Sequence, residues 1–218
     1  MGPACLDYGV FERVVVEGAD FIRINTAYAN KEQYDIVFDN LKRIVNNKTA
    51  QVIFDIRSAD VLESISSYNL EIIAVSFSES AEQLRQIQNS VPSGKIIAKI
   101  ESERGVEKFD EIMDISWGVM IARGDLGRAV SLEKVPCLQK ELSKRVLERG
   151  KFLIVATEML LSMVDKPEPT RAEVSDVANA VFDGASAAML SEETAIGEYP
   201  VESVRCMRRV IEAAEECV

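Results

Sequence analysis

The stretch Lys95–Gly105, KIIAKIESERG, changes from an apolar run to the charged start of a helix. An apolar run followed by an amphipathic segment is typical of one strand and one helix of a parallel sheet. Lys99 and Glu101 stand two residues apart, so on a strand their side chains point to the same side. The stretch raises two questions: whether this unit repeats, and whether the lysine and the glutamate face a shared site.

The same strand and helix pattern recurs along the chain. The expected strands cover residues 19–25, 50–56, 71–77, 95–100, 117–122, 151–156 and 185–190. The expected helices cover residues 31–45, 58–68, 80–91, 104–115, 133–150, 169–184 and 200–216. Residues 7–17 resemble the helix of a further unit, whose strand is cut short at the start of the sequence. Continuous apolar strands that alternate with amphipathic helices indicate a parallel sheet covered by helices.

This alternation predicts an α/β fold, namely a single-domain (β/α)8 TIM barrel with a truncated first strand. A doubly wound open sheet is the alternative, because it is built from the same units. Several helix ends carry recognisable signals. Thr170 and Glu173 form a predicted capping box, Ser58 is a candidate N-cap, and Gly150 and Gly184 suit the position after a helix.

The composition excludes several classes of protein. The 218 residues carry a net charge of −11, which argues against nucleic-acid binding and against anionic membranes. The apolar content of 47% predicts a folded core, and no apolar run approaches the length of a membrane-spanning helix. The four cysteines lack the close spacing of a zinc site or a disulfide framework, so we expect a cytoplasmic protein with reduced thiols.

The chain contains no histidine. This excludes nucleophiles activated by histidine and metal sites that use imidazole. Acid–base or metal chemistry must therefore rely on carboxylates, lysine, hydroxyl groups or thiols.

Polar side chains gather where the predicted strands end. In a (β/α)8 barrel, active groups lie at the carboxyl ends of the strands. Ordinary ion pairing at the barrel rim is the alternative reading of these charges. The residues expected on this rim are Arg23, Asn25, Asp55, Ser76, Lys99, Glu101, Arg123, Asp125, Thr157, Ser191 and Glu193.

Three of these residues suggest metal-assisted chemistry. Glu101 and Asp125 follow adjacent strands and could hold one divalent cation, since Mg²⁺ usually takes few carboxylates and completes its shell with water and substrate. Lys99 would direct a point charge at a developing oxyanion or phosphoryl group. In ARGDLG, residues 122–127, glycines flank Asp125 and let the backbone approach a ligand, so N–H groups of this segment could bind a carboxylate; a simple turn after the strand is the alternative reading.

Two long stretches resemble the pyruvate kinase family. One is KIIAKIESERGVEKFDEIMDISWGVMIARGDLG, residues 95–127, and the other is ATEMLLSMVDKPEPTRAEVSDVANAVFDGASAAMLSEETAIGEYPVESV, residues 156–204. MGPAC and GADFIRIN near the start are similar to the first two strands of that family. The resemblance covers nearly the whole chain and is patchy before residue 95.

The resemblance implies phosphoryl transfer from phosphoenolpyruvate to ADP, giving pyruvate and ATP, with Mg²⁺ or Mn²⁺ as cofactor. It implies that Lys99 stabilises phosphoryl and enolate charge, that Arg23 contacts the transferred phosphoryl group, and that Thr157 lies beside the enolate carbon and assists its protonation. It also implies that Glu101 and Asp125 bind the metal, while Gly124 and Asp125 offer N–H groups to the substrate carboxylate.

The chain departs from the family pattern in several places. The resemblance implies that residues 1–218 are a catalytic barrel without the family's lid domain and without its C-terminal regulatory domain. Asn25 and Asp55 match the monovalent cation site, but Ala27 and Ile56 replace its usual hydroxyl residues. We therefore predict weak or no K⁺ dependence. Glu192 stands where a glycine is usual, which adds charge near the last strand.

The departures leave two other functions open. A barrel that stabilises an enolate could catalyse metal-assisted enolisation or decarboxylation of a pyruvate-like keto acid without a nucleotide. A non-catalytic barrel could bind phosphoenolpyruvate or a partner protein. The expected ligands are phosphoenolpyruvate or pyruvate and ADP or ATP, with neither nucleic acid nor membrane, and a homodimer is compatible with the family's contacts.

Overall fold

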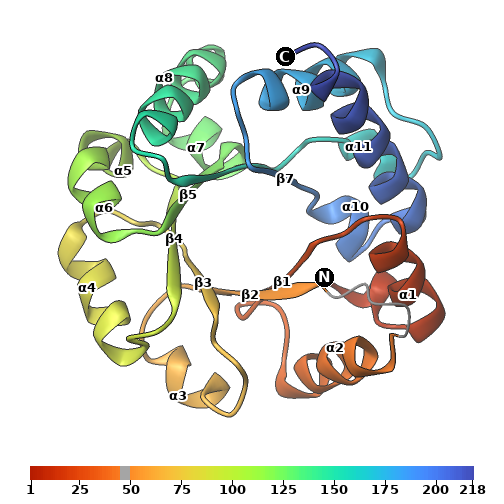
Figure 1. The fold of residues 1–218 in the computed structure, drawn as a ribbon, viewed down its shortest axis with the longest axis horizontal. Helices are drawn as coiled ribbons and strands as arrows, with labels where there is room; N and C mark the ends of the chain where they lie inside the picture. The colour runs from red at the N-terminus through yellow and green to blue at the C-terminus, as the bar shows by residue number, and fades with distance from the viewer. Residues whose placement is uncertain (45–49) are drawn as a thin grey trace. The chain divides into compact units, whose positions relative to one another are not determined.

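The structure is a computed structural model that describes residues 1–44 and 50–218. Within these residues it contains seven strands, which follow one another in the sheet in chain order (Figure 1). The pairs from β2 to β7 are parallel. The strands are β1 (Phe21–Asn25), β2 (Gln51–Ile56), β3 (Ile72–Val75), β4 (Lys95–Ile100), β5 (Gly118–Ala122), β6 (Phe152–Ala156) and β7 (Ala187–Met189).

The strand order decides between the two predicted architectures. A doubly wound sheet reverses its strand order partway along, whereas a (β/α)8 barrel keeps the order of the chain. The sequential order from β1 to β7 confirms the predicted barrel class. The residues before α1 form the short 3-10 turn η1 (Pro3–Cys5), which agrees with a truncated first strand.

Helices follow the strands, as the alternation predicts. They are α1 (Tyr8–Val16), α2 (Lys31–Arg43), α3 (Val61–Ile65), α4 (Ala81–Ser90), α5 (Glu103–Glu107), α6 (Phe109–Ile115), α7 (Arg123–Ala129), α8 (Val135–Glu148), α9 (Arg171–Phe182), α10 (Glu192–Ala195) and α11 (Pro200–Glu215), with 3-10 turns η2 (Leu132–Lys134) and η3 (Leu161–Val164). Val45, at the end of the expected helix 31–45, lies outside the described residues.

Three local expectations are wrong. The helix expected over residues 104–115 is split into α5 and α6, because Lys108 leaves helical geometry with φ −94° and ψ 12°. Helix α3 is shorter than expected and begins after Asp60, so Ser58 does not cap it and instead contacts the Asp60 carboxylate. After Ala122, the RGDLG part of ARGDLG belongs to a helix, α7, and does not form a simple turn.

Two compact units divide the chain. The first consists of Met1–Val52, Glu158–Phe182 and Leu190–Val218, and the second of Ile53–Thr157 and Asp183–Met189. In the first unit, α11 packs against α1 and α9. A core of Cys5, Val14, Val201 and Val204 lies between these elements.

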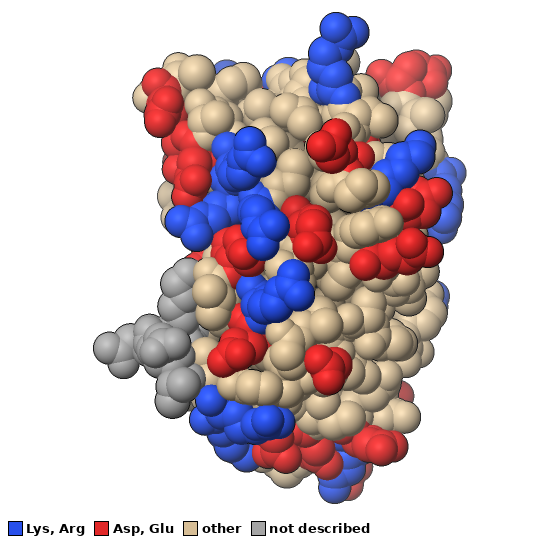
Figure 2. Space-filling model, turned by 90° about the vertical axis from the view of Figure 1, so that its right-hand side faces the viewer, with Lys and Arg blue, Asp and Glu red and all other residues tan. Residues whose placement is uncertain are grey.

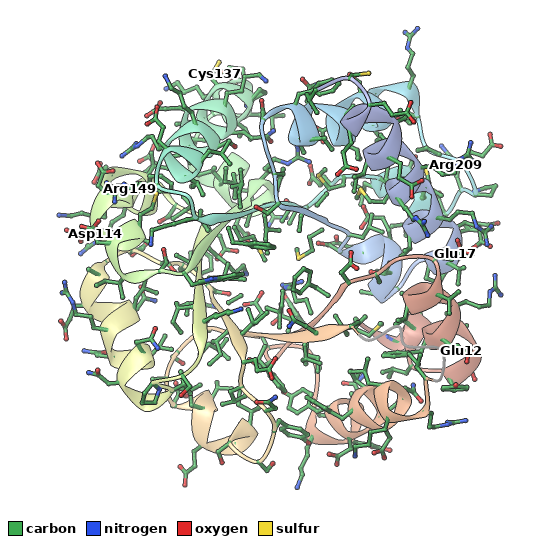
Figure 3. The ribbon with its side chains drawn as sticks, viewed as in Figure 1. Glu12, Glu17, Asp114, Cys137, Arg149 and Arg209 are labelled. Carbon is green, nitrogen blue, oxygen red and sulfur yellow. The ribbon has the colours of Figure 1, made fainter. Side chains whose placement is uncertain are left out.

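The second unit is built on buried strands. The residues of the strands β3, β4, β5 and β6 are almost all buried, as expected for parallel strands covered on both sides. Strands β5 and β6 approach closely at Gly118, where an added Cβ would lie 2.8 Å from the Phe152 carbonyl oxygen. On the outside of this unit, Arg149 at the end of α8 binds Asp114 of α6 at 2.7 Å (Figure 3).

The predicted helix ends are largely confirmed. Glu173 N–H donates to Thr170 Oγ1, while the Glu173 carboxylate accepts from Thr170 N–H, which completes the capping box. Gly150 and Gly184 have φ of +62° and +80°, the left-handed conformation that ends helices. Among residues 1–44 and 50–218, none of the helices has the length and apolar character to cross a membrane.

Candidate functional site

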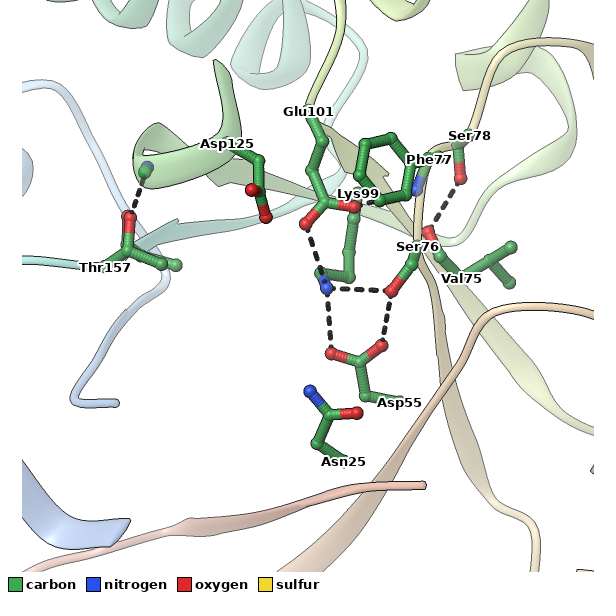
Figure 4. Close-up of polar contacts among 12 residues, drawn as sticks. Asn25, Asp55, Val75, Ser76, Phe77, Ser78, Lys99, Glu101, Asp125 and Thr157 are labelled. Carbon is green, nitrogen blue, oxygen red and sulfur yellow. Dashed lines mark hydrogen bonds and ion pairs between the residues drawn. The ribbon is translucent and has the colours of Figure 1, made fainter. Parts of the chain in front are cut away.

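A buried lysine lies at the carboxyl ends of three neighbouring strands in the second unit. Lys99 Nζ of β4 lies 2.9 Å from Oδ2 of Asp55, which comes from β2, and 3.0 Å from Oε1 of Glu101 (Figure 4). It also donates to Ser76 Oγ, just after β3, at 3.0 Å. Parallel strands end at the same edge of their sheet, which is why residues distant in sequence converge here.

A second set of hydrogen bonds fixes these acceptors. The Ser76 hydroxyl donates to Asp55 Oδ1 at 2.8 Å, and the N–H of Phe77 donates to Glu101 Oε2 at 2.7 Å. Phe77 adopts the left-handed region, with φ +49°. We call Asp55, Ser76, Lys99 and Glu101 the lysine cluster. All three N–H donors of the ammonium have acceptors within the cluster.

The lysine cluster is nearly sealed from solvent. The exposed fractions of the Lys99, Asp55 and Glu101 side chains are 6%, 1% and 3%. One ammonium group faces two carboxylate groups, so the cluster carries an excess of negative charge in a dry environment. Buried charges need partners, and a second cation nearby would balance this excess.

Asp125, the second carboxylate expected from the sequence to bind a metal ion, follows the strand next to that of Glu101. It lies in the first turn of α7, directly after β5, and β4 and β5 are paired. In Figure 4 its carboxylate points toward that of Glu101. Its side chain is 45% exposed and accepts from Arg128 at 3.2 Å. The donor chemistry fits Mg²⁺ or Mn²⁺, which take a few carboxylate oxygens and keep several waters.

The described residues show no group of three or more His, Cys, Asp or Glu side chains arranged to hold a metal ion. A divalent cation at Glu101 and Asp125 would thus take most of its ligands from water or from a bound substrate. The same two carboxylates were expected from the sequence to be the metal ligands.

Thr157 lies just after β6 and contacts the start of α7. Its Oγ1 accepts from Gly124 N–H at 2.7 Å and donates to the Ala156 carbonyl at 2.6 Å. Thr157 has φ +74°. The left-handed region is unfavourable for a β-branched residue, so the surrounding hydrogen bonds must hold this conformation. The structure thus pairs Thr157 with Gly124, two residues expected at the substrate.

Arg23 and Asn25, the remaining expected site residues, belong to β1 in the first unit. Asn25 Oδ1 accepts from the N–H of Ala27 at 3.0 Å. Asp55, its expected partner in a monovalent cation site, has both carboxylate oxygens engaged within the lysine cluster. Glu192 is exposed at the start of α10 in the first unit.

Two further polar residues are linked to Thr157: Arg123, which was expected on the rim, and the buried Gln139, which was not expected from the sequence. Arg123 donates to the Thr157 carbonyl at 2.8 Å and to Gln139 Oε1 at 3.2 Å, and Gln139 donates to Asp183 at 2.8 Å. Gln139 occupies a buried position on α8, in the apolar stripe that includes Leu142. A polar residue inside an apolar stripe is the signal that could have indicated it.

In the first unit, two carboxylates hold the segment that follows Thr157. The buried Glu193 accepts from the N–H of Leu160 at 2.9 Å. Glu173 accepts from the N–H and hydroxyl groups of both Ser162 and Thr170. Burial by itself would raise the pKa of Glu173, but these hydrogen bonds outweigh it and keep the pKa below its usual value.

Comparisons with known proteins agree on one family. The model of "Pyruvate kinase, barrel domain" matches residues 55–204. A pyruvate kinase of Chlamydia muridarum is 41% identical over 232 residues, covering 98% of this chain and 47% of that protein. A pyruvate kinase of Geobacillus stearothermophilus is 43% identical over 184 residues, covering 82% of this chain and 30% of that protein.

A pyruvate kinase of Methylorubrum extorquens is 46% identical over 156 residues, covering 71% of this chain and 32% of that protein. This chain therefore spans half or less of the length of these relatives. The matched region of the family model includes every member of the lysine cluster, together with Gly124, Asp125 and Thr157.

Proposed function

This chain belongs to the pyruvate kinase family, and we propose that its site transfers a phosphoryl group between phosphoenolpyruvate and ADP, giving pyruvate and ATP. The observation that carries this proposal is the lysine cluster, because a buried ammonium with an excess of carboxylate is unfavourable for stability and suited to charged chemistry. The cytoplasm is the proposed location of the reaction.

Lys99 would stabilise the charge that develops as the phosphoryl group leaves the enolate oxygen. Its three donors are engaged without substrate, so a phosphoryl oxygen must replace one acceptor. Ser76 is the neutral acceptor of the three, and hydrogen bonds to charged acceptors are the stronger ones. We therefore expect Lys99 to exchange the Ser76 hydroxyl for the phosphoryl oxygen while it keeps both carboxylates.

Glu101 and Asp125 would hold Mg²⁺ or Mn²⁺. Such an ion would supply positive charge to the phosphoryl oxygens and to the enolate. Phe77 supports this role, since its N–H fixes one oxygen of Glu101 while each carboxylate oxygen keeps a lone pair for a metal ion.

Thr157 would assist protonation of the enolate carbon, and the N–H groups of Gly124 and Asp125 would receive the substrate carboxylate. The Gly124 N–H donates to Thr157 Oγ1, so these two roles are linked: a carboxylate that takes the Gly124 N–H would free a lone pair of Thr157 Oγ1, while the hydroxyl proton stays with the Ala156 carbonyl. The proposed contact of Arg23 with the phosphoryl group is based on the similarity of residues 23–25, RIN, to the family sequence. Full engagement of Asp55 supports the prediction of weak or no K⁺ dependence.

The test is pyruvate formation from phosphoenolpyruvate by the full chain, with and without ADP and Mg²⁺. We expect ADP-dependent turnover that falls about 100-fold or more in Lys99→Met, since removal of one charge-stabilising donor costs that much. Asp125→Asn is the second variant, because its half-exposed side chain can change without disturbing the core. It should fold normally and lose metal-dependent turnover.

The other outcomes separate the alternatives. Exchange of pyruvate methyl protons without nucleotide, together with no ADP-dependent turnover, would replace the kinase by an enolising enzyme. Protection against thermal unfolding by phosphoenolpyruvate, without any turnover or exchange, would indicate a binding module. Turnover that is equal in the wild type and in both variants would contradict the assignment of the site.

A further inference from the structure

A chain of hydrogen bonds in the second unit connects the surface of α8 to the backbone of Thr157. Asp183 Oδ2 accepts from Gln139 Nε2 at 2.8 Å, and Gln139 Oε1 accepts from Arg123 at 3.2 Å. Arg123 in turn donates to the Thr157 carbonyl oxygen at 2.8 Å. We call Asp183, Gln139 and Arg123 the relay. None of its members is among the expected substrate or metal ligands.

The relay has a fixed polarity. Arginine only donates hydrogen bonds, and an ionised aspartate only accepts them. The amide of Gln139 offers one acceptor and one donor group, and it meets both neighbours in a single orientation. Gln139 is 5% exposed, so water does not substitute for these partners. Lys140 binds the other Asp183 oxygen at 2.6 Å from the exposed side.

The end of the relay lies at the strained residue. Thr157 has φ +74°, which costs about 1–2 kcal/mol for a residue with a Cβ. Rotation of its backbone would move both the carbonyl that Arg123 binds and the hydroxyl that binds Gly124. By holding the Thr157 carbonyl, the relay therefore also fixes the position of the Thr157 hydroxyl.

We propose that Gln139 and Asp183 are positioning residues that hold Thr157 through Arg123, with its hydroxyl directed at Gly124. This inference rests on the proposed function, in which Thr157 assists protonation of the enolate. A role in packing alone does not account for the arrangement, because an apolar side chain would fill the α8 stripe without needing two polar partners.

The test breaks the hydrogen bond between Gln139 and Asp183 and then restores it with donor and acceptor exchanged. Gln139→Glu removes the donor that Asp183 needs and places two carboxylates face to face. In the double variant Gln139→Glu with Asp183→Asn, the new asparagine can donate to the new glutamate, and the net charge equals that of the wild type. Lys140→Gln is the matched control, because it removes the exposed ion pair of Asp183 and leaves the relay unchanged.

Two readouts are needed. Amide hydrogen exchange of Gly124 reports its hydrogen bond to Thr157 without any catalysis. We expect exchange about five- to tenfold faster in Gln139→Glu, which is the loss of one hydrogen bond, and near wild type in the double variant and in Lys140→Gln. For turnover we expect kcat to fall about 10- to 100-fold in Gln139→Glu, as for a misplaced catalytic group, with KM for phosphoenolpyruvate changed far less.

These readouts separate the inference from the proposed function. If no form makes pyruvate but Gly124 exchange follows the expected pattern, the proposed function fails and the positioning of Thr157 stands. Unchanged Gly124 exchange in Gln139→Glu overturns the inference, as does a double variant as impaired as the single one. If Gln139→Glu does not fold, Gln139→Met, which deletes both hydrogen bonds at similar volume, takes its place with the same expected exchange.

Discussion

The lysine cluster of the second unit and the exposed ion pairs of the first unit, which we call the outer pairs, both join a cation to carboxylates but in opposite surroundings. Lys99 and its two carboxylates are at most 6% exposed. In the first unit, Arg205 of α11 binds Glu17 after α1 at 2.7 Å, with side chains 46% and 27% exposed. Figure 2 shows Lys and Arg interleaved with Asp and Glu over the face that carries these helices.

Exposed and buried ion pairs contribute to the free energy of unfolding in different ways. An exposed ion pair contributes about 0–1 kcal/mol, because water and salt screen the charges. A buried pair loses its hydration, and well-packed apolar residues in its place are often as stable or more stable. The outer pairs therefore change the stability of the fold little. The lysine cluster loses much hydration free energy on folding, so a catalytic role explains it better than a contribution to stability. Replacing a cation by methionine in each region tests this difference.

The largest effect is expected for Lys99→Met. It leaves Asp55 and Glu101 buried without their cation, and loss of one partner of a buried pair costs about 3–5 kcal/mol. Urea unfolding at neutral pH measures this loss directly. A change below about 1 kcal/mol would show that water reaches the cluster and would remove the contrast with the outer pairs.

The next largest change in the free energy of unfolding is expected for Glu173 of the first unit. Unlike the outer pairs, its carboxylate accepts four hydrogen bonds. Glu173→Gln should lower the free energy of unfolding at pH 7 by about 1–3 kcal/mol, since charged acceptors bind more strongly. The pKa of Glu173 is lowered by folding. Its stabilisation is thus fully present above the ordinary carboxyl pKa of about 4.3 and is lost as the pH falls through the lower folded-state pKa.

Denaturant unfolding of wild type and Glu173→Gln between pH 7 and pH 3 checks this prediction. The difference between the two proteins should shrink as the pH falls. Glu216→Gln, at the exposed end of α11, is the control and should change little at any pH. A difference that stays constant with pH would assign the loss to packing rather than to the charge.

Asp55→Asn sharpens the account of the lysine cluster. It leaves one ammonium facing one carboxylate, Glu101, so the excess of negative charge disappears. We expect a loss of only about 1 kcal/mol, well below that of Lys99→Met, because a hydrogen bond weakens but no charge is left without a partner. A loss as large as that of Lys99→Met, measured by the same unfolding experiment, would show that Asp55 is the main partner of Lys99.

The smallest effect is expected for Arg205→Met. Loss of its pair with Glu17 should change the free energy of unfolding by about 0.5 kcal/mol or less. The bond from Arg205 lowers the pKa of Glu17, and this interaction should fade as salt is added. Unfolding at low and at high ionic strength measures it; a loss of several kcal/mol would contradict the contrast.

Much of the fold could be predicted because its signals are local. Each apolar run with its amphipathic neighbour marks a strand and a helix, and the pair Thr170 and Glu173 marks a helix start within four residues. The break at Lys108 could not be predicted, since residues 104–115 have a continuous helical pattern and the local geometry there overrides it. Helix α7 was missed for the opposite reason, because the glycines of ARGDLG suggest a turn.

The sequence by itself determined the class of fold, the family, and the set of side chains at the strand ends, because periodicity and motifs are carried by neighbouring residues. Only the tertiary structure decided which of these side chains meet. Lys99 binds Asp55 and Ser76 because separate strands end side by side, and Gln139 reaches Thr157 through Arg123 because α8 packs against β5 and β6. Contacts of this kind depend on sheet register and helix docking, which no short stretch of sequence encodes.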